Sequence, residues 1–264
     1  MPRLIPLIGL LIVLTSFSAC AHKPRKGGMI YQVSTINALL EGCFDGRVDF
    51  REIKKHGDFG IGALDGVDGE LIGLGGRFFQ VKGDGQVLPV ADTMTTPYAV
   101  VTFFEPGRAA DISDVENYAR LDAFLDNLIE TKNIFYAVKI EGEFARVKAR
   151  SIPRQSKPYR PLVEVVRDQS VFEFSNIKGT LVGFRCPPYL ASLDFPGYHF
   201  HFIDEARAAG GHVMELRIIK ARVEIDPCHS FSLALPDGGE FYSLDLSQDK
   251  QQELKKVQSR SGSE

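Results

Sequence analysis

The spacing of apolar and polar residues predicts many short strands in the first half of the chain. Between residues 58 and 90, short apolar stretches alternate with Asp-Gly and Gly-Gly steps, which is typical of strands joined by tight turns. The apolar run at 98–104 is bounded by Pro97 and Pro106, and this predicts a buried strand.

The pattern predicts more strands after residue 133. In the longest of them the apolar phase changes at Ile218 and Ile219, which indicates a β-bulge that redirects the following side chains. The expected strands are a hairpin of 134–140 and 144–151, followed by 172–174, 179–184, 198–203, 212–225, 231–235 and 241–246.

Helices are predicted where apolar residues recur every three or four positions. The expected helices are 34–40 with Ser34 as N-cap, 114–131 with Ser113 as N-cap, 162–168 and 249–257. Many strands with few helices predict an α+β fold, in which two closely packed mixed or antiparallel β-sheet halves surround the core.

A proline-rich connection, SIPRQSKPYRP, separates the two predicted halves. Prolines and basic residues in such density favour a loop. We therefore expect one catalytic domain over 29–264, with sub-halves of about 29–155 and 156–246 and a C-terminal tail at 247–264.

The first twenty residues resemble an export signal. Arg3 precedes an apolar run at 4–14, and Ser18-Ala19-Cys20 resembles a lipoprotein cleavage box. We expect a signal peptide over 1–20, lipidation of Cys20 and a polar tether at 21–28, which would place the protein in the periplasm or on a membrane. Secretory cleavage near Ala21 and an uncleaved anchor are the alternatives.

Composition and charge narrow the class of protein. A hydrophobic content of 44% fits a folded domain, while a net charge of −3 argues against nucleic-acid binding. Apart from Cys20, the chain has Cys43, Cys186 and Cys228, whose spacing matches no paired motif. We expect these three cysteines to be small buried residues. The alternative, one disulfide and one free thiol, stays possible after export.

Three histidines form the candidate metal site. His199 and His201 are two positions apart in a predicted strand, so their rings lie on one face. The Gly210-Gly211 step suggests a hairpin that could set His212 opposite His201. Three imidazoles with an open fourth position are typical of a catalytic zinc site, which we expect near the junction of the two halves.

The histidines alone leave the chemistry undecided. Such an ion could activate water for hydrolysis or act as a Lewis acid on a substrate carbonyl. The glycines of GIGALDG and GLGG lack the strand-to-helix context of a nucleotide site, so no organic cofactor is expected.

Several long blocks of the sequence resemble the bacterial α-acetolactate decarboxylase family. The blocks are YQVSTINALLEGCFDG, HGDFGIGALDGVDGE, VTFFEP, RSIPRQSKPYRPLVEVV, FSNIKGTLVGFRCPPY and PGYHFHFIDEARAAGGHV. They occur in the family's order over about residues 29–246.

The resemblance implies a carboxy-lyase that uses one zinc ion per chain to convert 2-acetolactate to acetoin and CO2, in the pathway to 2,3-butanediol. It places the metal on the same three histidines, an active-site glutamate at Glu70 and an arginine at Arg150. It further implies that zinc chelates the keto and hydroxyl oxygens of the substrate and stabilises the enediolate, and that the protein is a homodimer.

The family also has an acid near the C-terminus that reaches the active site. The matching stretch, QQELKKVQ, contains Glu253 but ends in Gln258, and an amide cannot supply a carboxyl proton. If the family's acid corresponds to Glu253, that residue is a candidate catalytic residue. If it corresponds to Gln258, proton delivery or substrate orientation is altered. Two alternatives stay open: a cupin-like metal-dependent oxygenase or hydrolase, and a non-catalytic zinc-binding lipoprotein.

Overall fold

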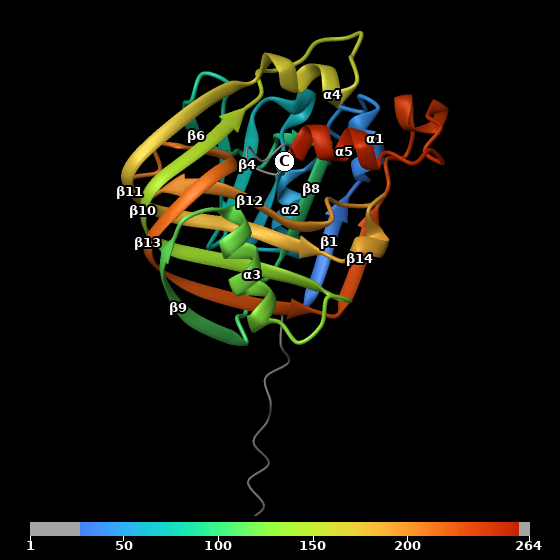
Figure 1. The fold of residues 1–264 in the computed structure, drawn as a ribbon. Coiled ribbons are helices and arrows are strands. Elements are labelled where there is room, and N and C mark those ends of the chain that lie inside the picture. Colours follow the sequence, from blue (N-terminus) through green and yellow to red (C-terminus); the bar gives the residue numbers. More distant parts are fainter. Residues whose placement is uncertain (1–26, 259–264) are drawn as a thin grey trace, which may run out of the picture.

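The computed structural model describes residues 27–258 as two β-sheets packed face to face, with short helices around them (Figure 1). The predicted signal peptide, Cys20, residues 21–26 of the tether and residues 259–264 of the tail lie outside the described residues. Within 27–258, no helix has the length and apolarity needed to cross a membrane.

The first sheet has seven strands in the order β14-β1-β8-β3-β4-β5-β6. β1 and β14 run parallel, whereas the other neighbours are antiparallel, so the sheet is mixed. Its strands are β1 (Met29–Val33), β3 (Phe59–Ala63), β4 (Glu70–Leu74), β5 (Arg77–Val81), β6 (Val87–Pro89), β8 (Tyr98–Thr102) and β14 (Ser230–Ala234).

The second sheet is antiparallel, with the order β10-β11-β12-β13-β9. β10 also pairs with β13 along most of its length, so the sheet closes on itself around β10, β11, β12 and β13. Its strands are β9 (Arg108–Val115), β10 (Phe135–Ser151), β11 (Ser170–Cys186), β12 (Gly197–Asp204) and β13 (Gly210–Cys228).

Helices cover the ends and one outer face of the sheets. α3 lies against β9 and β13, while α5 lies beside α4 and near α1 at the end where the predicted site is found (Figure 1). The helices are α1 (Ile36–Leu40), α2 (Phe50–His56), α3 (Tyr118–Leu128), α4 (Leu162–Val165) and α5 (Gln251–Gln258). β2 (Val48–Asp49) and β7 (Thr95–Thr96) form a separate two-stranded sheet, and short 3-10 turns include η1 (Asp65–Val67) and η4 (Gly239–Ser243).

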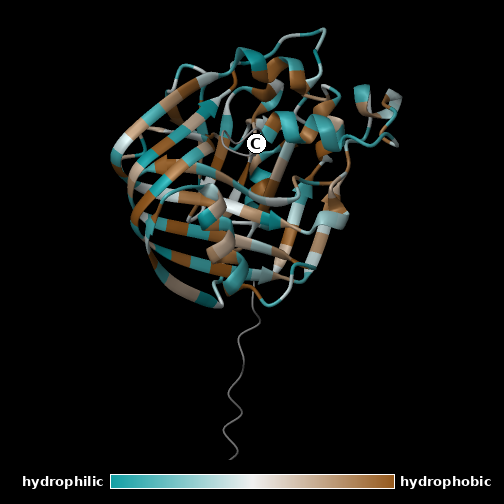
Figure 2. Ribbon diagram, viewed as in Figure 1, coloured by the Kyte–Doolittle hydropathy of each residue, from teal (hydrophilic) through white to brown (hydrophobic). Residues whose placement is uncertain are grey.

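The main core lies between the two sheets. Ile61 and Ile72 of the first sheet are buried in one cluster with Val182 and Phe184 of the second, and the rings of Phe59 and Phe184 meet at 5.7 Å between centroids. Apolar and polar segments alternate along the long strands (Figure 2), as expected when one face of each strand is buried. The predicted α+β fold with two packed sheets is confirmed.

The predicted hairpin at 134–151 is wrong, because these residues form the single strand β10. Gly142, which lies between the two predicted strands, is inside the ladder opposite Ala221. A Cβ atom at Gly142 would come within 2.3 Å of the Lys220 carbonyl oxygen, so glycine serves close strand approach here. The strands predicted at 172–174 and 179–184 likewise merge into β11.

Other boundaries also differ from the prediction. The helix expected from 114 begins at Tyr118 with Asn117 as N-cap, because Ser113 belongs to β9 and pairs with Lys220. Thr35, and not Ser34, caps α1. The strand expected at 241–246 is absent from the described residues, where η4 and an extended segment occupy that region.

The bulge expected near Ile219 is confirmed. Ile218 pairs with Phe144 and Lys220 pairs with Glu143, which leaves Ile219 as an extra residue. The sheets do not divide the chain near residue 155, however. β14 joins the first sheet and β9 and β10 join the second, so the predicted sub-halves do not correspond to the two sheets.

Candidate metal centre and active site

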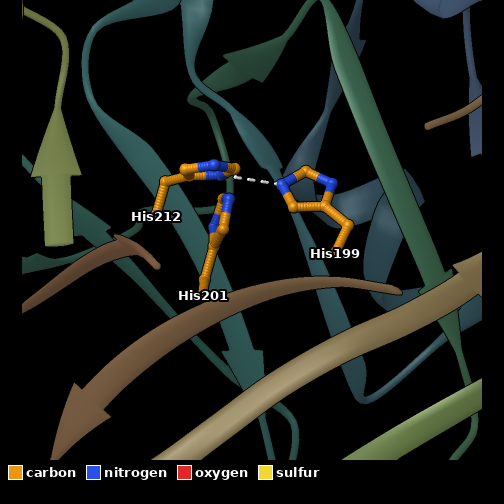
Figure 3. A group of neighbouring side chains, drawn as sticks. All are labelled: His199, His201 and His212. Carbon is orange, nitrogen blue, oxygen red and sulfur yellow. Dashed lines mark hydrogen bonds between the residues drawn. The ribbon is translucent and has the colours of Figure 1, made fainter. Parts of the chain in front are cut away.

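The three predicted histidines converge at one point between the sheets (Figure 3). His199 and His201 lie on one face of β12, and His212 of β13 pairs directly with His201, in the register that the sequence predicts. One nitrogen from each ring lies within 4.8 Å of the others, and His199 Nε2 is 2.9 Å from His212 Nδ1. All three side chains are buried.

His201 is oriented by the opposite sheet. Its Nδ1 lies 2.8 Å from the carbonyl oxygen of Leu71 in β4, so Nδ1 carries the proton and donates it to that oxygen. Burial lowers the pKa of His201 to about 3, which keeps the ring neutral. Nε2 is therefore an unprotonated nitrogen facing the centre, the form that binds a metal ion.

Strand register places Arg150 beside the histidines. Arg150 of β10 pairs with His212 of β13, and directly paired residues project to the same face of a sheet. The side chain is only 5% exposed. Its Nη2 donates to the Val257 carbonyl oxygen at 3.0 Å, whereas its Nη1 has no hydrogen-bond partner within residues 27–258.

Glu70 enters the same centre from the first sheet. It is the first residue of β4 and is 7% exposed, and its Oε2 lies 3.5 Å from His201 Nε2. Burial raises the pKa of Glu70 to about 7, although the positive charge of Arg150 opposes that rise. Glu70 can therefore hold or release a proton near neutral pH.

The rest of the cavity wall is apolar except for the hydroxyl group of Tyr98. Phe195 packs its ring edge-on against His199 at 4.8 Å between centroids. The lining residues are Leu39, Gly62, Ala63, Val67, Gly69, Glu70, Tyr98, Arg150, Ile152, Leu162, Phe195, His199, His201, His212 and Val257. Apolar walls with a few convergent polar groups are typical of a small-molecule site.

The C-terminal helix reaches the cavity through a different residue from the one predicted. Val257 of α5 lines the cavity, whereas Glu253 does not and lies 3.8 Å from Lys250 in an ion pair. Gln258 has a buried Nε2 with no hydrogen-bond partner in the part of the chain that the structure describes. Glu253 and Val257 are four residues apart in α5, so they lie on nearly the same face of the helix but one turn apart. Only Val257 is close enough to line the cavity.

No sequence pattern marked several residues of this wall. Val67, Tyr98, Phe195 and Val257 are apolar or aromatic residues in ordinary sequence contexts, and only the packing of the sheets and of α5 brings them together. Cys43, Cys186 and Cys228 are all buried, and none of them forms a disulfide within residues 27–258. The open possibility of a disulfide among them is therefore not realised.

Comparison with known proteins agrees with the geometry. The family described as Alpha-acetolactate decarboxylase matches residues 30–248. This chain belongs to that family. An Alpha-acetolactate decarboxylase of Methanosarcina mazei is 48% identical over 230 residues, covering 87% of this chain and 80% of the relative. One from Brevibacillus brevis is 43% identical, with 87% and 81% covered.

Solved structures of α-acetolactate decarboxylases share the fold. The crystal structure of the enzyme from Bacillus subtilis strain 168 superimposes with a TM-score of 0.85 at 37% identity, covering 88% of this chain and 99% of the other. A Staphylococcus aureus protein described as similar to α-acetolactate decarboxylase gives a TM-score of 0.81 at 29% identity, covering 87% and 98%. The resemblance inferred from the sequence is confirmed.

The residues of the site fit a divalent metal ion. Three buried imidazoles offer ring nitrogens within 4.8 Å of one another, and one ring is already held in its metal-binding tautomer by the Leu71 carbonyl. An all-nitrogen set of three with space beside it suits zinc and similar divalent ions in open, catalytic coordination.

Proposed function

We propose that the protein is a zinc-dependent carboxy-lyase that decarboxylates 2-acetolactate to acetoin and CO2, the step that supplies acetoin for 2,3-butanediol formation. Membership of the α-acetolactate decarboxylase family supports the reaction. The three histidines support the metal dependence. The family match favours this lyase over a cupin-like oxygenase or hydrolase.

The observation that carries this proposal is the buried guanidinium beside the histidines. Arg150 is 5% exposed and its Nη1 has no partner within residues 27–258. A buried charged donor without a partner is costly, and a substrate carboxylate would satisfy it with a charge-assisted hydrogen bond. The site is thus built for a small carboxylic acid.

His199, His201 and His212 would hold the ion. When bound, zinc would supply Lewis-acid stabilisation for negative charge that develops on the keto and hydroxyl oxygens of the substrate. Three neutral ligands leave the full double charge of the ion available for that purpose.

Arg150 binds and orients the carboxylate group of the substrate. Its guanidinium is fixed by the Val257 carbonyl, so little side-chain entropy is lost on binding. After the carbon–carbon bond breaks, the same positive charge favours the electron-rich enediolate that remains.

Glu70 holds the proton that acetoin needs. Loss of CO2 leaves an enediolate whose carbon must be protonated, and a carboxyl group with a pKa of about 7 is partly protonated near neutral pH. Glu70 projects from the opposite sheet to Arg150, so binding and protonation are assigned to different walls of the site.

The proposal is tested by incubating the purified protein with racemic 2-acetolactate and measuring acetoin above its spontaneous formation. Chelation of the metal should abolish the activity and zinc should restore it. His199→Ala should lose bound metal and activity together. Metal-loaded protein that forms no acetoin would instead indicate the non-catalytic zinc-binding lipoprotein.

Arg150→Lys gives a sharper test of the carboxylate site. Lysine keeps the charge but loses the planar pair of donors, so we expect kcat/KM to fall by about 100-fold while zinc content stays unchanged. Lys148→Arg is the matched control. Lys148 is on the same strand but does not line the cavity, and its Nζ lies 3.0 Å from Glu215 Oε1. Equal activity of Arg150→Lys and the native protein would contradict the assignment.

A further inference from the structure

Val67 contributes to the cavity wall with an unusual backbone. Its φ angle is 45°, in the left-handed region, and its side chain is only 2% exposed and lines the cavity. A β-branched residue rarely adopts this conformation, because its Cβ substituents crowd the backbone. Such strain persists only where the surrounding structure holds it, and it is concentrated at functional sites.

The turn that contains Val67 leads directly into Glu70. Gly66 and Gly69 flank it with φ angles of 69° and 80°, and a Cβ atom at Gly69 would come within 2.1 Å of the Val81 carbonyl oxygen. Position 69 therefore requires glycine, and residues 65–69 can follow only a narrow path. The position of Val67 is consequently tied to that of Glu70.

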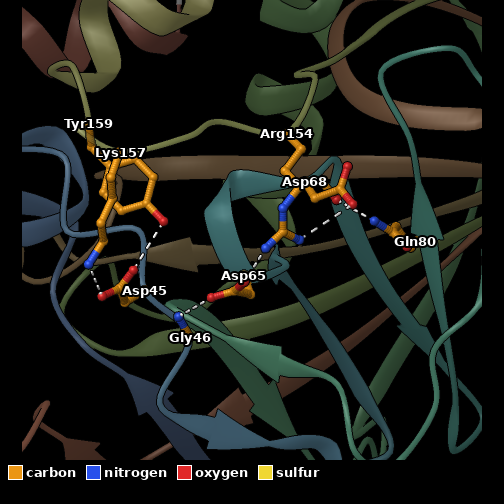
Figure 4. A network of polar contacts seen from close by, with 8 residues as sticks. All are labelled: Asp45, Gly46, Asp65, Asp68, Gln80, Arg154, Lys157 and Tyr159. Carbon is orange, nitrogen blue, oxygen red and sulfur yellow. Dashed lines mark hydrogen bonds and ion pairs between the residues drawn. The ribbon is translucent and has the colours of Figure 1, made fainter.

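Polar contacts fix this turn from one side through Asp65 (Figure 4). Asp65 Oδ1 accepts from the Gly46 backbone N–H at 2.8 Å, and its Oδ2 accepts from Arg154 Nη2 at 2.5 Å. Arg154 lies in the loop that follows β10, the strand that carries Arg150. The loops after Arg150 and before Glu70 are thus joined by an ion pair.

The other side of the turn is fixed through its backbone. Gln80 Nε2 donates to the Asp68 carbonyl oxygen at 2.6 Å, and the Gly69 N–H donates to the Ile152 carbonyl oxygen at 2.9 Å. Arg154 Nη1 also lies 3.9 Å from Asp68 Oδ2. We call Asp65, Asp68, Gln80 and Arg154 the turn clamp (Figure 4).

We propose that Val67 is a specificity-determining residue, which limits the size of the alkyl group carried at C2 by a 2-hydroxy-3-oxo acid substrate. This inference rests on the proposed decarboxylase function. The clamped, strained turn holds the two methyl groups of Val67 in one place, three residues before Glu70, so this part of the wall cannot retract to admit a larger substituent. A mobile side chain could move aside for an extra methylene group, whereas a fixed one excludes it.

The test compares two substrates, 2-acetolactate with a methyl group at C2 and its homologue with an ethyl group at C2. The measured quantity is the ratio of kcat/KM for the ethyl to the methyl substrate. Val67→Ala should raise this ratio about tenfold, the effect of one methylene in a rigid pocket, and Val67→Leu should lower it. Zinc content should be the same in all variants.

Val100→Ala is the matched control, because Val100 is buried in β8 but does not line the cavity. It should lower the melting temperature without moving the ratio. If Val67→Ala does not fold, Val67→Gly replaces it, because glycine adopts a positive φ angle without strain.

The outcomes separate the two proposals. A native protein that forms no acetoin from 2-acetolactate overturns the proposed function. The role of Val67 alone is overturned by a different result. In that case the native protein is active, but the ratio of kcat/KM for the ethyl to the methyl substrate is the same in Val67→Ala (or Val67→Gly) and Val67→Leu as in the native protein.

Discussion

At the scale of single residues, a second buried polar contact lies beside the histidine cavity. Tyr98 donates a hydrogen bond to Asp194 Oδ1 at 2.5 Å, and the Phe195 N–H donates to the same oxygen at 2.7 Å. Both side chains are buried. Because Tyr98 belongs to the first sheet and Phe195 packs on His199, this contact joins the wall of one sheet to the candidate metal ligands of the other.

The burial of Asp194 makes stability depend on pH. Burial raises the pKa of Asp194 from 3.8 to about 6, although the hydrogen bonds from Tyr98 and Phe195 oppose the rise. The neighbouring groups are the Tyr98 hydroxyl and the Cys186 thiol, whose pKa values are also raised, chiefly by burial. In the unfolded chain Asp194 ionises near 3.8, so the folded state loses stability as the pH rises from about 4 to 6.

Asp194→Asn should remove this dependence, because the amide oxygen still accepts both hydrogen bonds but carries no charge. We expect the native protein to lose up to about 3 kcal/mol relative to the variant between pH 4 and pH 7. Urea unfolding of both metal-free proteins at four pH values measures the difference. Parallel stability curves across that range would show that Asp194 ionises equally in the folded and unfolded chains.

At the scale of elements, α5 is a short cover over the candidate active site. Leu254 and Val257 are buried against the main core, Lys250 lies 2.6 Å from Glu41 in an ion pair, and the Val257 carbonyl accepts from Arg150. The ion pair between Lys250 and Glu41 is only partly buried and contributes little, so the two apolar residues supply most of the attachment. Arg150 is therefore oriented only while α5 is docked.

Leu254→Ala should detach α5 while leaving the two sheets folded. Removing a buried leucine side chain costs about 2 to 5 kcal/mol of folding free energy. A loss of this size exceeds the free energy that holds a weakly packed eight-residue helix on the core. We expect faster proteolysis near residue 250 and a roughly tenfold lower kcat/KM. Gln252→Ala, an exposed position on the same helix, is the control.

Limited proteolysis with mass spectrometry measures the first effect and the acetoin assay the second. A variant with a protected C-terminal segment and a melting temperature lowered for the whole domain would show that α5 unfolds only with the sheets.

At the scale of the whole molecule, the candidate metal ligands and the proposed proton donor come from different sheets. The histidines and Arg150 lie in the second sheet and Glu70 in the first, so the site exists only when the sheets are packed together. β14 adds a further link, because it follows β13 in the chain but pairs with β1 of the first sheet. Folding of the core and assembly of the site are therefore coupled.

The location of the protein and its homodimeric state stay predictions from the sequence and the family resemblance. If Cys20 is lipidated after export, the protein should fractionate with membranes, and Cys20→Ser should move it to the soluble fraction without changing kcat/KM. Cell fractionation with immunoblotting measures this. Recovery of both forms in the same fraction would indicate secretory cleavage or an uncleaved anchor instead.

The sequence alone predicted the convergence of the three histidines and most of the strands. A two-residue spacing in a strand, and a glycine step before His212, were sufficient to predict the register that pairs His201 with His212, because both are local consequences of strand geometry. The family blocks, read along the chain, then pointed to Glu70 and Arg150 as candidate site residues, and the structure brings both beside the histidines. No local pattern marked either residue, since a charged strand face is usually solvated.

Only the tertiary structure decided how these groups act. The charged face of β10 is buried at Arg150 because α5 and the first sheet cover the end of the strand. The hairpin predicted at 134–151 failed for the same kind of reason, because pairing with β11 and β13 outweighs the turn tendency of Gly142. Burial, pKa shifts and the strained turn at Val67 arise from contacts between segments distant in sequence, which local patterns cannot encode.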